Sequence, residues 1–391
     1  MTVGLALFAV FTIFWLTFLI QAAYHGAAIH TLKSVAHITD KTANKVSVII
    51  AARNEAVALR MSLPRLLKTG YPAVEFIIIN DRSTDDSRFV LQGYAAKDSR
   101  FRIIDVADLP RGWLGKVHAL NEGIKIATGE WLLLSDADVH FEPAAIGMAV
   151  EKAVEQSLDH LLLLPKMRAE RSRFLIPIFN LCFGMMFISR IKARDLGKAG
   201  SSAFGGVGAF NLIRRSLYDR SEGLEWLKLE VLDDVGVGLL MKRAGGKAGI
   251  FASAGEVHLE WYASIKETIR GLEKNAFAGF ARYSIVRAVA TIVFLVLMSI
   301  GALVVAVALD STPLLGMYLV LFLLAPAVGI LLVGPEQDLK VWHGLFVPLG
   351  LLFIALILAR STWRSLRQRG VYWRETFYPI DELRKGQRVK L

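Results

Sequence analysis

Short apolar runs alternate with longer amphipathic segments through the first half of the chain. The runs are nearly continuous stretches of Val, Ile, Leu and aromatic residues, and helix-length segments separate them. This pattern predicts βαβ units with a buried, parallel sheet, so the fold class is α/β. The predicted strands are Val46–Ala52, Val74–Ile79, Phe101–Val106 and Trp131–Leu134, followed by a fifth at Leu161–Lys166.

Acidic residues follow three of these predicted strands. Glu55 comes soon after the first strand, Asp81 after the second, and Asp136 and Asp138 after the fourth. In open α/β sheets the ligand lies off the carboxyl ends of the strands. We therefore expect one edge of the sheet to carry several carboxylates.

Four apolar stretches are each near the roughly 20 residues that a helix needs to cross a bilayer. They are Val3–Ala23, Ala288–Leu309, Leu314–Val333 and Val341–Ala359. A signal peptide is the alternative for the first stretch, but it lacks a basic start and its apolar run is too long. An uncleaved anchor fits this stretch better.

The apolar stretches divide the chain into four parts. We expect a transmembrane anchor at 1–24, an α/β domain at 45–285, transmembrane segments at 286–359 and a basic, aromatic tail at 360–391.

Two segments of the α/β domain have the composition of helices at a membrane surface. Phe174–Ile188 is apolar but only about 15 residues long, which suits the interface or a core. Trp261–Tyr283 predicts an amphipathic helix in which basic and aromatic residues are interleaved. The single cysteine, Cys182, lies in the first segment, and we expect it to be a buried structural thiol.

The number of predicted spans and the basic residues of the tail place the C-terminal tail on opposite sides of the membrane. If the α/β domain is cytoplasmic, three full spans after it leave the tail outside. Basic residues favour the cytoplasmic side, which places Arg360–Arg374 inside. One of the last three stretches is therefore expected to be re-entrant, and Leu314–Val333, with Pro326, is the candidate.

The protein is basic, with 46 Lys and Arg against 35 Asp and Glu and a net charge of +11. Many of the basic residues flank apolar stretches, which favours anionic lipid headgroups on the cytoplasmic face. No DNA- or RNA-binding motif occurs in the sequence, so we expect no nucleic-acid partner.

The Asp136-Ala-Asp138 pair carries the clearest chemistry. Two carboxylates at a strand end offer oxygen-only ligands, which suit Mg²⁺ or Mn²⁺ bridging diphosphate oxygens. Asp81 is a candidate for a ribose or base contact, or else for a helix cap or turn. Glu55 is a candidate for the base or the metal shell, or else a first-turn glutamate favoured by the helix dipole.

Three further features remain open at this level. In Asp233-Asp234, either carboxylate could accept a proton from an attacking hydroxyl, or simply cap a helix. Lys116 follows a glycine-containing loop and could meet a phosphate, or lie exposed at a helix start. The glycine-rich stretch 200–208 could cradle a phosphate, but close strand packing explains it equally well.

These motifs, in this order, resemble the inverting family 2 glycosyltransferases with the GT-A fold. The resemblance covers about Val46 to Phe280, through Val48–Glu55 (V-I-I-A-A-R-N-E), Asn80–Asp85, Asp136–Asp138 and Asp233–Asp234. Leu109–Lys116, Glu273–Phe277 and Trp373–Pro379 are similar to a narrower branch, the hopanoid- and carotenoid-associated membrane glycosyltransferases.

The resemblance implies a role for each motif. Asp136 and Asp138 would serve the metal and the diphosphate, and Asp234, the second acid of its pair, would be the general base. The residues expected to bind the nucleotide-sugar are Ala52, Arg53, Glu55, Asp81, Ser83, Lys116, Asp136, Ala137 and Asp138.

Two departures from the family pattern matter. Asn80 stands where the family usually has an Asp, so nucleotide binding depends on Asp81. No Q-x-x-R-W motif, which processive synthases carry, follows Asp234. Arg270 and Lys274 are candidates to replace its cations near the diphosphate. These two residues and Asp233 are the candidates for contact with the diphosphate or the acceptor.

The sequence thus predicts a membrane-anchored glycosyltransferase that faces the cytoplasm. It would transfer one sugar from a UDP- or GDP-sugar to a lipid of the polyprenyl, hopanoid, carotenoid or glycerolipid type. The alternatives are a processive polysaccharide synthase and a non-catalytic membrane scaffold that binds a nucleotide-sugar.

Overall fold

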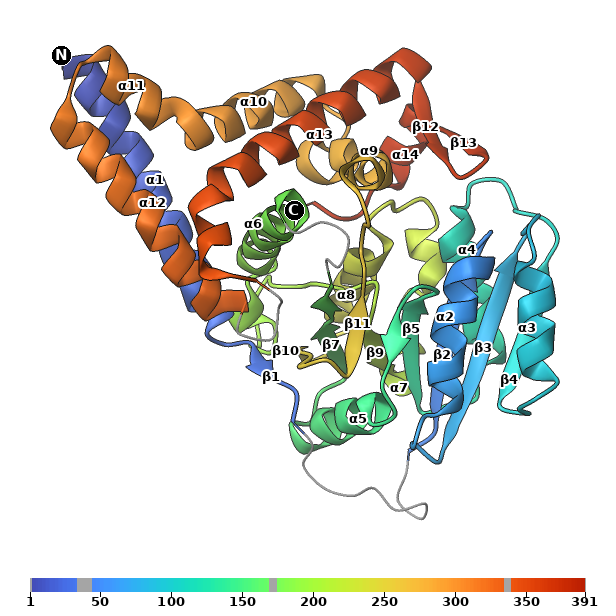
Figure 1. Cartoon of the computed structure of the whole chain (residues 1–391). Helices are drawn as coiled ribbons and strands as arrows, with labels where there is room; N and C mark the ends of the chain where they lie inside the picture. Colours follow the sequence, from blue (N-terminus) through green and yellow to red (C-terminus); the bar gives the residue numbers. More distant parts are fainter. Residues whose placement is uncertain (1, 34–43, 169–173, 334–338, 391) are drawn as a thin grey trace.

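An eight-stranded sheet forms the centre of the protein in a computed structural model that describes residues 2–33, 44–168, 174–333 and 339–390 (Figure 1). The strand order is β1-β10-β7-β9-β5-β2-β3-β4. Strand β9 runs antiparallel to both of its neighbours, and the other pairs are parallel. The strands are β1 His30–Thr31, β2 Val46–Ala52, β3 Val74–Asp81, β4 Phe101–Val106, β5 Trp131–Asp136, β7 His160–Leu164, β9 Asn211–Arg214 and β10 Ala248–Ala252.

Helices cover both faces of this sheet. In β2, Val48 and Ile50 pack with α2, α3 and α5, whereas Ile49 packs on the opposite side with α4 and α8. A strand that is buried on both faces reads as a continuous apolar run, which explains the sequence pattern. The helices of this layer are α2 Ala56–Leu67, α3 Ser87–Ala95, α4 Gly115–Ile126, α5 Ala145–Glu155, α7 Arg215–Tyr218 and α8 Asp233–Arg243.

The structure confirms the predicted parallel strands but extends two of them. Strand β3 continues to Asp81 and β5 to Asp136, because their ladders with neighbouring strands continue that far. The predicted strand Leu161–Lys166 is divided. Its first part is β7, and Lys166–Met167 is β8 of a second sheet with β6 His140–Phe141 and β11 Val257–Leu259.

The amphipathic helix α9 spans Ile265–Ala281, so it begins later than the predicted Trp261. The reason is local, because the Ser264 side chain caps the helix by accepting a hydrogen bond from the backbone N–H of Glu267 at 3.2 Å. Trp261 and Tyr262 consequently lie in the loop before the helix.

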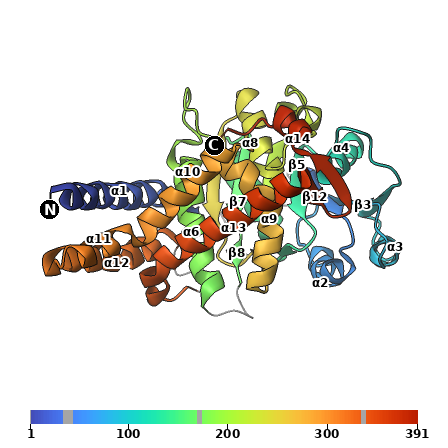
Figure 2. The ribbon, with the colours of Figure 1, turned by 90° about the horizontal axis from the view of Figure 1, so that it is seen from above.

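Long apolar helices form a bundle beside the α/β domain. Figures 1 and 2 show α1, α11 and α12 extending together, with the N-terminus and the α11–α12 turn at the far end. A π-helical turn joins α10 to α11, and its backbone carbonyls accept hydrogen bonds from Trp15 (2.8 Å) and Tyr318 (3.1 Å). The helices are α1 Thr2–Gly26, α10 Ile285–Val296, α11 Ala302–Ala308 and α12 Thr312–Val333.

Four helices in the described residues have the length and apolar composition to cross a membrane. They are Phe8–Gly26, Leu175–Asp195, Ile285–Ala308 and Trp342–Gln368, and Thr312–Leu321 is a shorter apolar helix. The second differs from our expectation of about 15 residues, because α6, Leu175–Arg190, continues into a 3-10 turn. Cys182 on α6 is a buried free thiol, as expected.

The C-terminal part of the chain folds back onto the α/β domain. Helix α13, Val347–Gln368, packs against α6, α9 and α10 and leads into the hairpin β12 Gly370–Trp373 and β13 Thr376–Pro379, then α14 Ile380–Gly386. The fully buried Glu230 accepts hydrogen bonds from the backbone N–H groups of Arg388 (2.6 Å) and Val389 (2.8 Å). The tail is therefore tied to the loop that precedes α8.

Candidate active site

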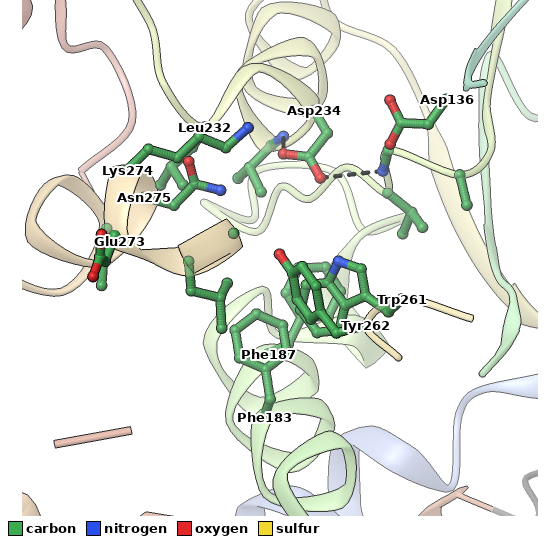
Figure 3. Close-up of a pocket in the computed structure, with 18 of the residues that line it drawn as sticks. Asp136, Phe183, Phe187, Leu232, Asp234, Trp261, Tyr262, Glu273, Lys274 and Asn275 are labelled. Carbon is green, nitrogen blue, oxygen red and sulfur yellow. Dashed lines mark hydrogen bonds between the residues drawn. The ribbon is translucent and has the colours of Figure 1, made fainter. Parts of the chain in front are cut away.

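A cavity of about 1570 Å³ lies off the carboxyl ends of β2, β3 and β5. Its walls come from the sheet edge, the glycine-rich loop, α6, α9, α13 and the β12–β13 hairpin. Figure 3 shows that acidic and basic side chains enter from one part of this cavity and aromatic side chains from another. The sequence predicted this sheet edge as the site, but not the walls that α13 and the hairpin supply.

The predicted acidic pair lies in the cavity wall. Asp136 ends β5, Ala137 and Asp138 follow it, and Ser62 holds their loop by donating to the Ala137 carbonyl at 2.8 Å. Burial, together with the nearby charges of Asp136 and Glu55, raises the pKa of Asp138. Asp136, Asp138 and Glu55 thus place several negative charges close together in the wall of the cavity.

Lys116 at the start of α4 bridges two of the predicted acidic residues. Its Nζ lies 2.6 Å from Asp136 Oδ1 and 3.0 Å from Asp233 Oδ2. Burial alone would lower the pKa of Lys116, but the carboxylates of Asp136, Asp233 and Asp234 outweigh it and raise the pKa. Lys116 is therefore a permanent cation at this site, and not an exposed lysine.

Asp234 lies in the first turn of α8 and points into the cavity (Figure 3). Its two carboxylate oxygens accept from the backbone N–H groups of Val235 (2.8 Å) and Gly208 (3.1 Å). Burial and then the adjacent Asp233 raise its pKa. A fixed carboxylate with a raised pKa is suited to take a proton near neutral pH.

The backbone of the glycine-rich loop 200–208 lies very close to Asp234 and Asp136. A Cβ at Gly206 would lie 1.7 Å from the Asp234 carbonyl oxygen, and one at Gly208 would lie 2.7 Å from Asp136 Oδ2. Close packing requires these glycines, but against the first turn of α8 and the Asp136 side chain, and not between strands as the alternative expected. Gly208 also contributes directly, because its N–H orients the Asp234 carboxylate.

Asp81 ends β3 and is buried, but its carboxylate already has a partner. Arg82 Nε and Nη2 lie 2.6 and 2.8 Å from its two oxygens. Gly115 makes room for this pair, since a Cβ there would lie 2.7 Å from Asp81 Oδ2. The pair lines the cavity, whereas Ser83 lies outside its wall and accepts a hydrogen bond from the Asn54 backbone at 3.0 Å.

Glu55 and Arg53, in the loop after β2, face the cavity together with Ala52. Both charged residues have partners at the tip of the C-terminal hairpin, where Arg374 pairs with Glu55 and Glu375 pairs with Arg53. Burial raises the pKa of Glu55 although Arg374 opposes the shift. No sequence pattern predicts these pairs, because they join residues more than 300 positions apart.

An aromatic surface lies across the cavity from the carboxylates (Figure 3). The Trp261 ring stacks on Tyr262 at 5.1 Å and contacts Phe183 of α6 at 5.0 Å. Gly271 on α9 leaves the space that the Tyr262 ring occupies, because a Cβ there would lie 2.3 Å from the ring. Sequence reasoning placed Trp261 on a membrane-surface helix and missed this role.

Lys274 on α9 enters the same cavity and lies 3.9 Å from the centre of the Trp373 ring. Burial, reinforced by the charge of Lys116, lowers its pKa to about 8. Arg270, the other basic residue predicted here, is exposed at the cavity wall. The structure therefore brings Lys274 to the site and leaves Arg270 at its margin.

The cavity continues into an apolar arm between α6, α9, α10 and α13. Phe187, Phe294 and Ile357 contribute to its wall, and Phe294 is also exposed on the outer surface of α10. Asn180 and Asn275 line the cavity with buried side-chain oxygens that have no hydrogen-bond partner within the described residues. The arm can therefore accept an apolar chain and a polar group.

The acidic end of the cavity fits a divalent cation. Asp136 and Asp138 line the cavity and provide the oxygen ligands that Mg²⁺ and Mn²⁺ prefer. In the described residues no group of three or more His, Cys, Asp or Glu side chains is arranged to hold a metal. A cation bound here would share its coordination with a ligand such as a diphosphate.

The fold is an α/β domain of the GT-A type. Residues 47–221 match the model of Glycosyl transferase family 2. The mannosyltransferase PcManGT from Pyrobaculum calidifontis, solved with GDP-Man and Mn²⁺, has a similar fold. Its TM-score is 0.53 at 16% identity, over 94% of this chain and 99% of that one.

Two curated relatives each match part of this chain. The uncharacterized glycosyltransferase YibD of Escherichia coli is 34% identical over 116 residues, which are 30% of this chain and 32% of that protein. The 4,4'-diaponeurosporenoate glycosyltransferase of Staphylococcus aureus is 35% identical over 97 residues, which are 25% of this chain and 24% of that protein. The chain thus matches about a third or less of the length of these relatives.

Proposed function

We propose that the protein is a membrane-anchored, inverting glycosyltransferase that transfers a single sugar from a nucleotide-sugar to a lipid. One observation carries the proposal: the cavity joins a cluster of carboxylates and cations at the sheet edge to an apolar arm between α6, α9 and α10. A donor that carries a diphosphate suits the first part, and an acceptor with a lipid chain suits the second.

Asp234 is the base of the proposed reaction. It takes the proton of an acceptor hydroxyl, and the hydroxyl oxygen attacks the anomeric carbon on the face opposite the diphosphate. The bond between this carbon and the diphosphate oxygen breaks, so the configuration inverts and a nucleoside diphosphate leaves. Asp233, Gly208 and Lys116 hold Asp234 and its surroundings in place.

Charge at the leaving group is balanced by this chain's cations and by a metal. Asp136 and Asp138 would hold Mg²⁺ or Mn²⁺, which supplies positive charge for the leaving diphosphate. Lys116 and Lys274 add positive charge to the same cavity. Trp261 and Tyr262 offer an aromatic face on which a sugar ring can stack.

The acceptor class follows from the apolar arm. Helix α10 contributes Thr291 and Phe294 to the lining of the cavity, and its exposed apolar residues include Val286 and Val289. A lipid of the polyprenyl, hopanoid, carotenoid or glycerolipid type can therefore reach the cavity from a bilayer. The unpaired oxygens of Asn180 and Asn275 suit hydroxyl donors of the acceptor.

A release assay tests the proposal. Detergent-purified protein is incubated with Mg²⁺ or Mn²⁺, total membrane lipid and a panel of UDP- and GDP-sugars that includes GDP-mannose, and the released nucleoside diphosphate is measured. Release with one donor that depends on added lipid, with a singly glycosylated lipid as product, supports the proposal. A polymer product indicates a processive synthase, and binding without turnover for any donor indicates a scaffold.

A further inference from the structure

The C-terminal hairpin lies over the nucleotide end of the cavity. Figure 1 shows it extending from the end of α13 towards the edge of the sheet that carries β2 and β3. At its tip, Glu375 lies 3.0 Å from Arg53 Nη2, and Arg374 forms an ion pair with Glu55. Two ion pairs of opposite direction thus connect the tip to the loop after β2.

The hairpin does not need Arg374 in order to dock. Its body is held by the buried side chains of Val371 and Tyr378 and by a hydrogen bond between Tyr378 and the Gly115 backbone. The Arg53–Glu375 pair gives a second attachment at the tip itself. The Arg374 side chain, by contrast, remains 45% exposed, so its pairing with Glu55 adds little to stability.

Charge in the cavity gives Arg374 another use. The carboxylates Asp136, Asp138 and Glu55 all line the cavity, and a donor diphosphate would bring further negative charge to them. Lys116 is already shared between two carboxylates. Arg374 lines the same cavity as Lys116 and Lys274.

A guanidinium is suited to a diphosphate by its shape. It presents paired N–H donors in a plane and can bind two phosphate oxygens at once, which an ammonium group cannot do with fixed geometry. The exchange requires only that the Arg374 side chain leave Glu55 and turn into the cavity, whose wall it already forms.

We infer that Arg374 is a diphosphate-binding residue of the donor site. Before the donor binds, Arg374 is paired with Glu55. The β12–β13 hairpin carries this residue, and the buried side chains of Val371 and Tyr378 hold the hairpin in position. The inference rests on the proposed function, because it assigns a further contact to the same nucleotide-sugar.

Adjacent residues of the hairpin tip provide a matched test. Arg374→Ala and Glu375→Ala each remove one ion pair to the same loop, and Arg374→Lys retains the charge without the planar fork. Binding of UDP, GDP, UMP and GMP is measured by calorimetry with Mg²⁺ present. We expect Arg374→Ala to weaken binding of the preferred nucleoside diphosphate about ten- to a hundredfold. Binding of its monophosphate should change less than about threefold.

The controls separate a binding role from a structural one. Glu375→Ala should change diphosphate affinity less than about threefold, and Arg374→Lys should fall between wild type and Arg374→Ala. Unfolding midpoints of all variants are measured on the same preparations. Equal losses for the diphosphate and the monophosphate, or equal effects of Arg374→Ala and Glu375→Ala, would overturn the inference.

Failure of this inference is distinguishable from failure of the proposed function. If wild type turns over a nucleotide-sugar with lipid while Arg374→Ala binds the diphosphate as wild type does, only the inference is wrong. If wild type binds neither UDP nor GDP and turns over no donor, the proposed function fails and the inference fails with it.

Discussion

Two adjacent carboxylates at the start of α8 have different neighbours and should respond differently to substitution. Asp234 is oriented by backbone N–H groups and faces the cavity, whereas Asp233 pairs with Lys116. Asp234→Asn keeps the shape but cannot take a proton. We expect the turnover number to fall about 100- to 10,000-fold, with nucleoside diphosphate affinity nearly unchanged.

Asp233→Asn is the matched control for this prediction. It removes one of the two carboxylate partners of Lys116 but leaves the proposed base in place. Its loss of turnover should therefore be clearly smaller than that of Asp234→Asn in the same release assay. The opposite order would move the role of base to Asp233.

A buried carboxylate at the other end of the sheet gives a prediction about stability. Glu75 accepts hydrogen bonds from Ser47 (2.6 Å) and from the backbone and side chain of Thr128 (2.7 and 2.8 Å). Burial alone would raise its pKa, but these bonds and Lys45 lower the pKa to about 2. The ionised form is thus favoured by folding.

The sign of the pH dependence follows from this lowered pKa. Stability from Glu75 is fully present above its unfolded pKa of about 4.3 and is lost as pH falls towards 2. Glu75→Gln should reduce the free energy of unfolding by about 1–3 kcal/mol at pH 7. The difference from wild type should shrink between pH 5 and pH 3 in detergent-solubilised protein, and a constant difference would contradict this account.

At the residue scale, the sequence predicted those site residues that belong to short motifs. Asp136, Asp138 and Asp234 were identified because each follows a buried strand or opens a helix within a recognisable motif. Tyr262 and Arg374 were missed as site residues, because their positions depend on packing between segments far apart in the chain. Arg374, for example, meets Glu55 across 319 positions.

At the scale of elements, the glycine-rich loop packs so closely against α8 that a side chain at Gly206 would overlap the helix backbone. A Cβ at Gly206 would meet the Asp234 backbone, whereas one at Gly208 would meet the movable Asp136 side chain. Gly206→Ala should therefore destabilise the fold by about 1–3 kcal/mol. Gly208→Ala should leave stability nearly unchanged but lower turnover about 10- to 100-fold by displacing Asp136.

Gly93 on α3 is the control for these substitutions, since a Cβ there would meet nothing within 4 Å. Gly93→Ala should change the free energy of unfolding by less than about 1 kcal/mol, and in the stabilising direction, because alanine favours a helix. Thermal unfolding and the release assay on the three variants check the set. Normal turnover in Gly208→Ala would show that the close approach is not needed for catalysis.

Strands were more predictable than helix boundaries. The apolar runs of β2, β3 and β5 are buried on both faces, so composition alone identifies them. The start of α9 depends on the Ser264 cap, a local hydrogen bond that the amphipathic period does not report. Periodicity extended this helix over Trp261 and Tyr262, which instead belong to the site.

At the scale of the whole molecule, the sheet limits which apolar helices can cross a membrane. The chain enters α6 from β8 and returns to β9, and both strands belong to sheets of the α/β domain. A single crossing by α6 would separate them. We therefore infer that α6 does not cross, although it is long and apolar enough.

The same reasoning revises the expected re-entrant segment. The tail contacts the domain through Glu230 and Glu55, so an even number of crossings must separate the domain from the tail. Helix α13 packs along α6 and α9, whereas α10–α11 leads away from the domain and α12 leads back (Figure 2). We infer that α13, and not Leu314–Val333, is the segment that does not cross.

Three crossings, by α1, α10–α11 and α12, then place the α/β domain and the tail on one side. Nucleotide-sugars and the basic residues of the tail favour the cytoplasm for that side.

Cysteine labelling tests this topology. The variants are made in a Cys182→Ala background, which removes the one native thiol. In intact cells a membrane-impermeant maleimide should label Ser311→Cys, in the α11–α12 turn, but neither Lys97→Cys nor Lys385→Cys. Lys97→Cys and Lys385→Cys should react once the cells are permeabilised. If Lys97→Cys and Lys385→Cys reacted on opposite sides, the even number of crossings would be wrong. Labelling of Ser311→Cys only after permeabilisation would show that α10–α11 and α12 do not cross as a pair.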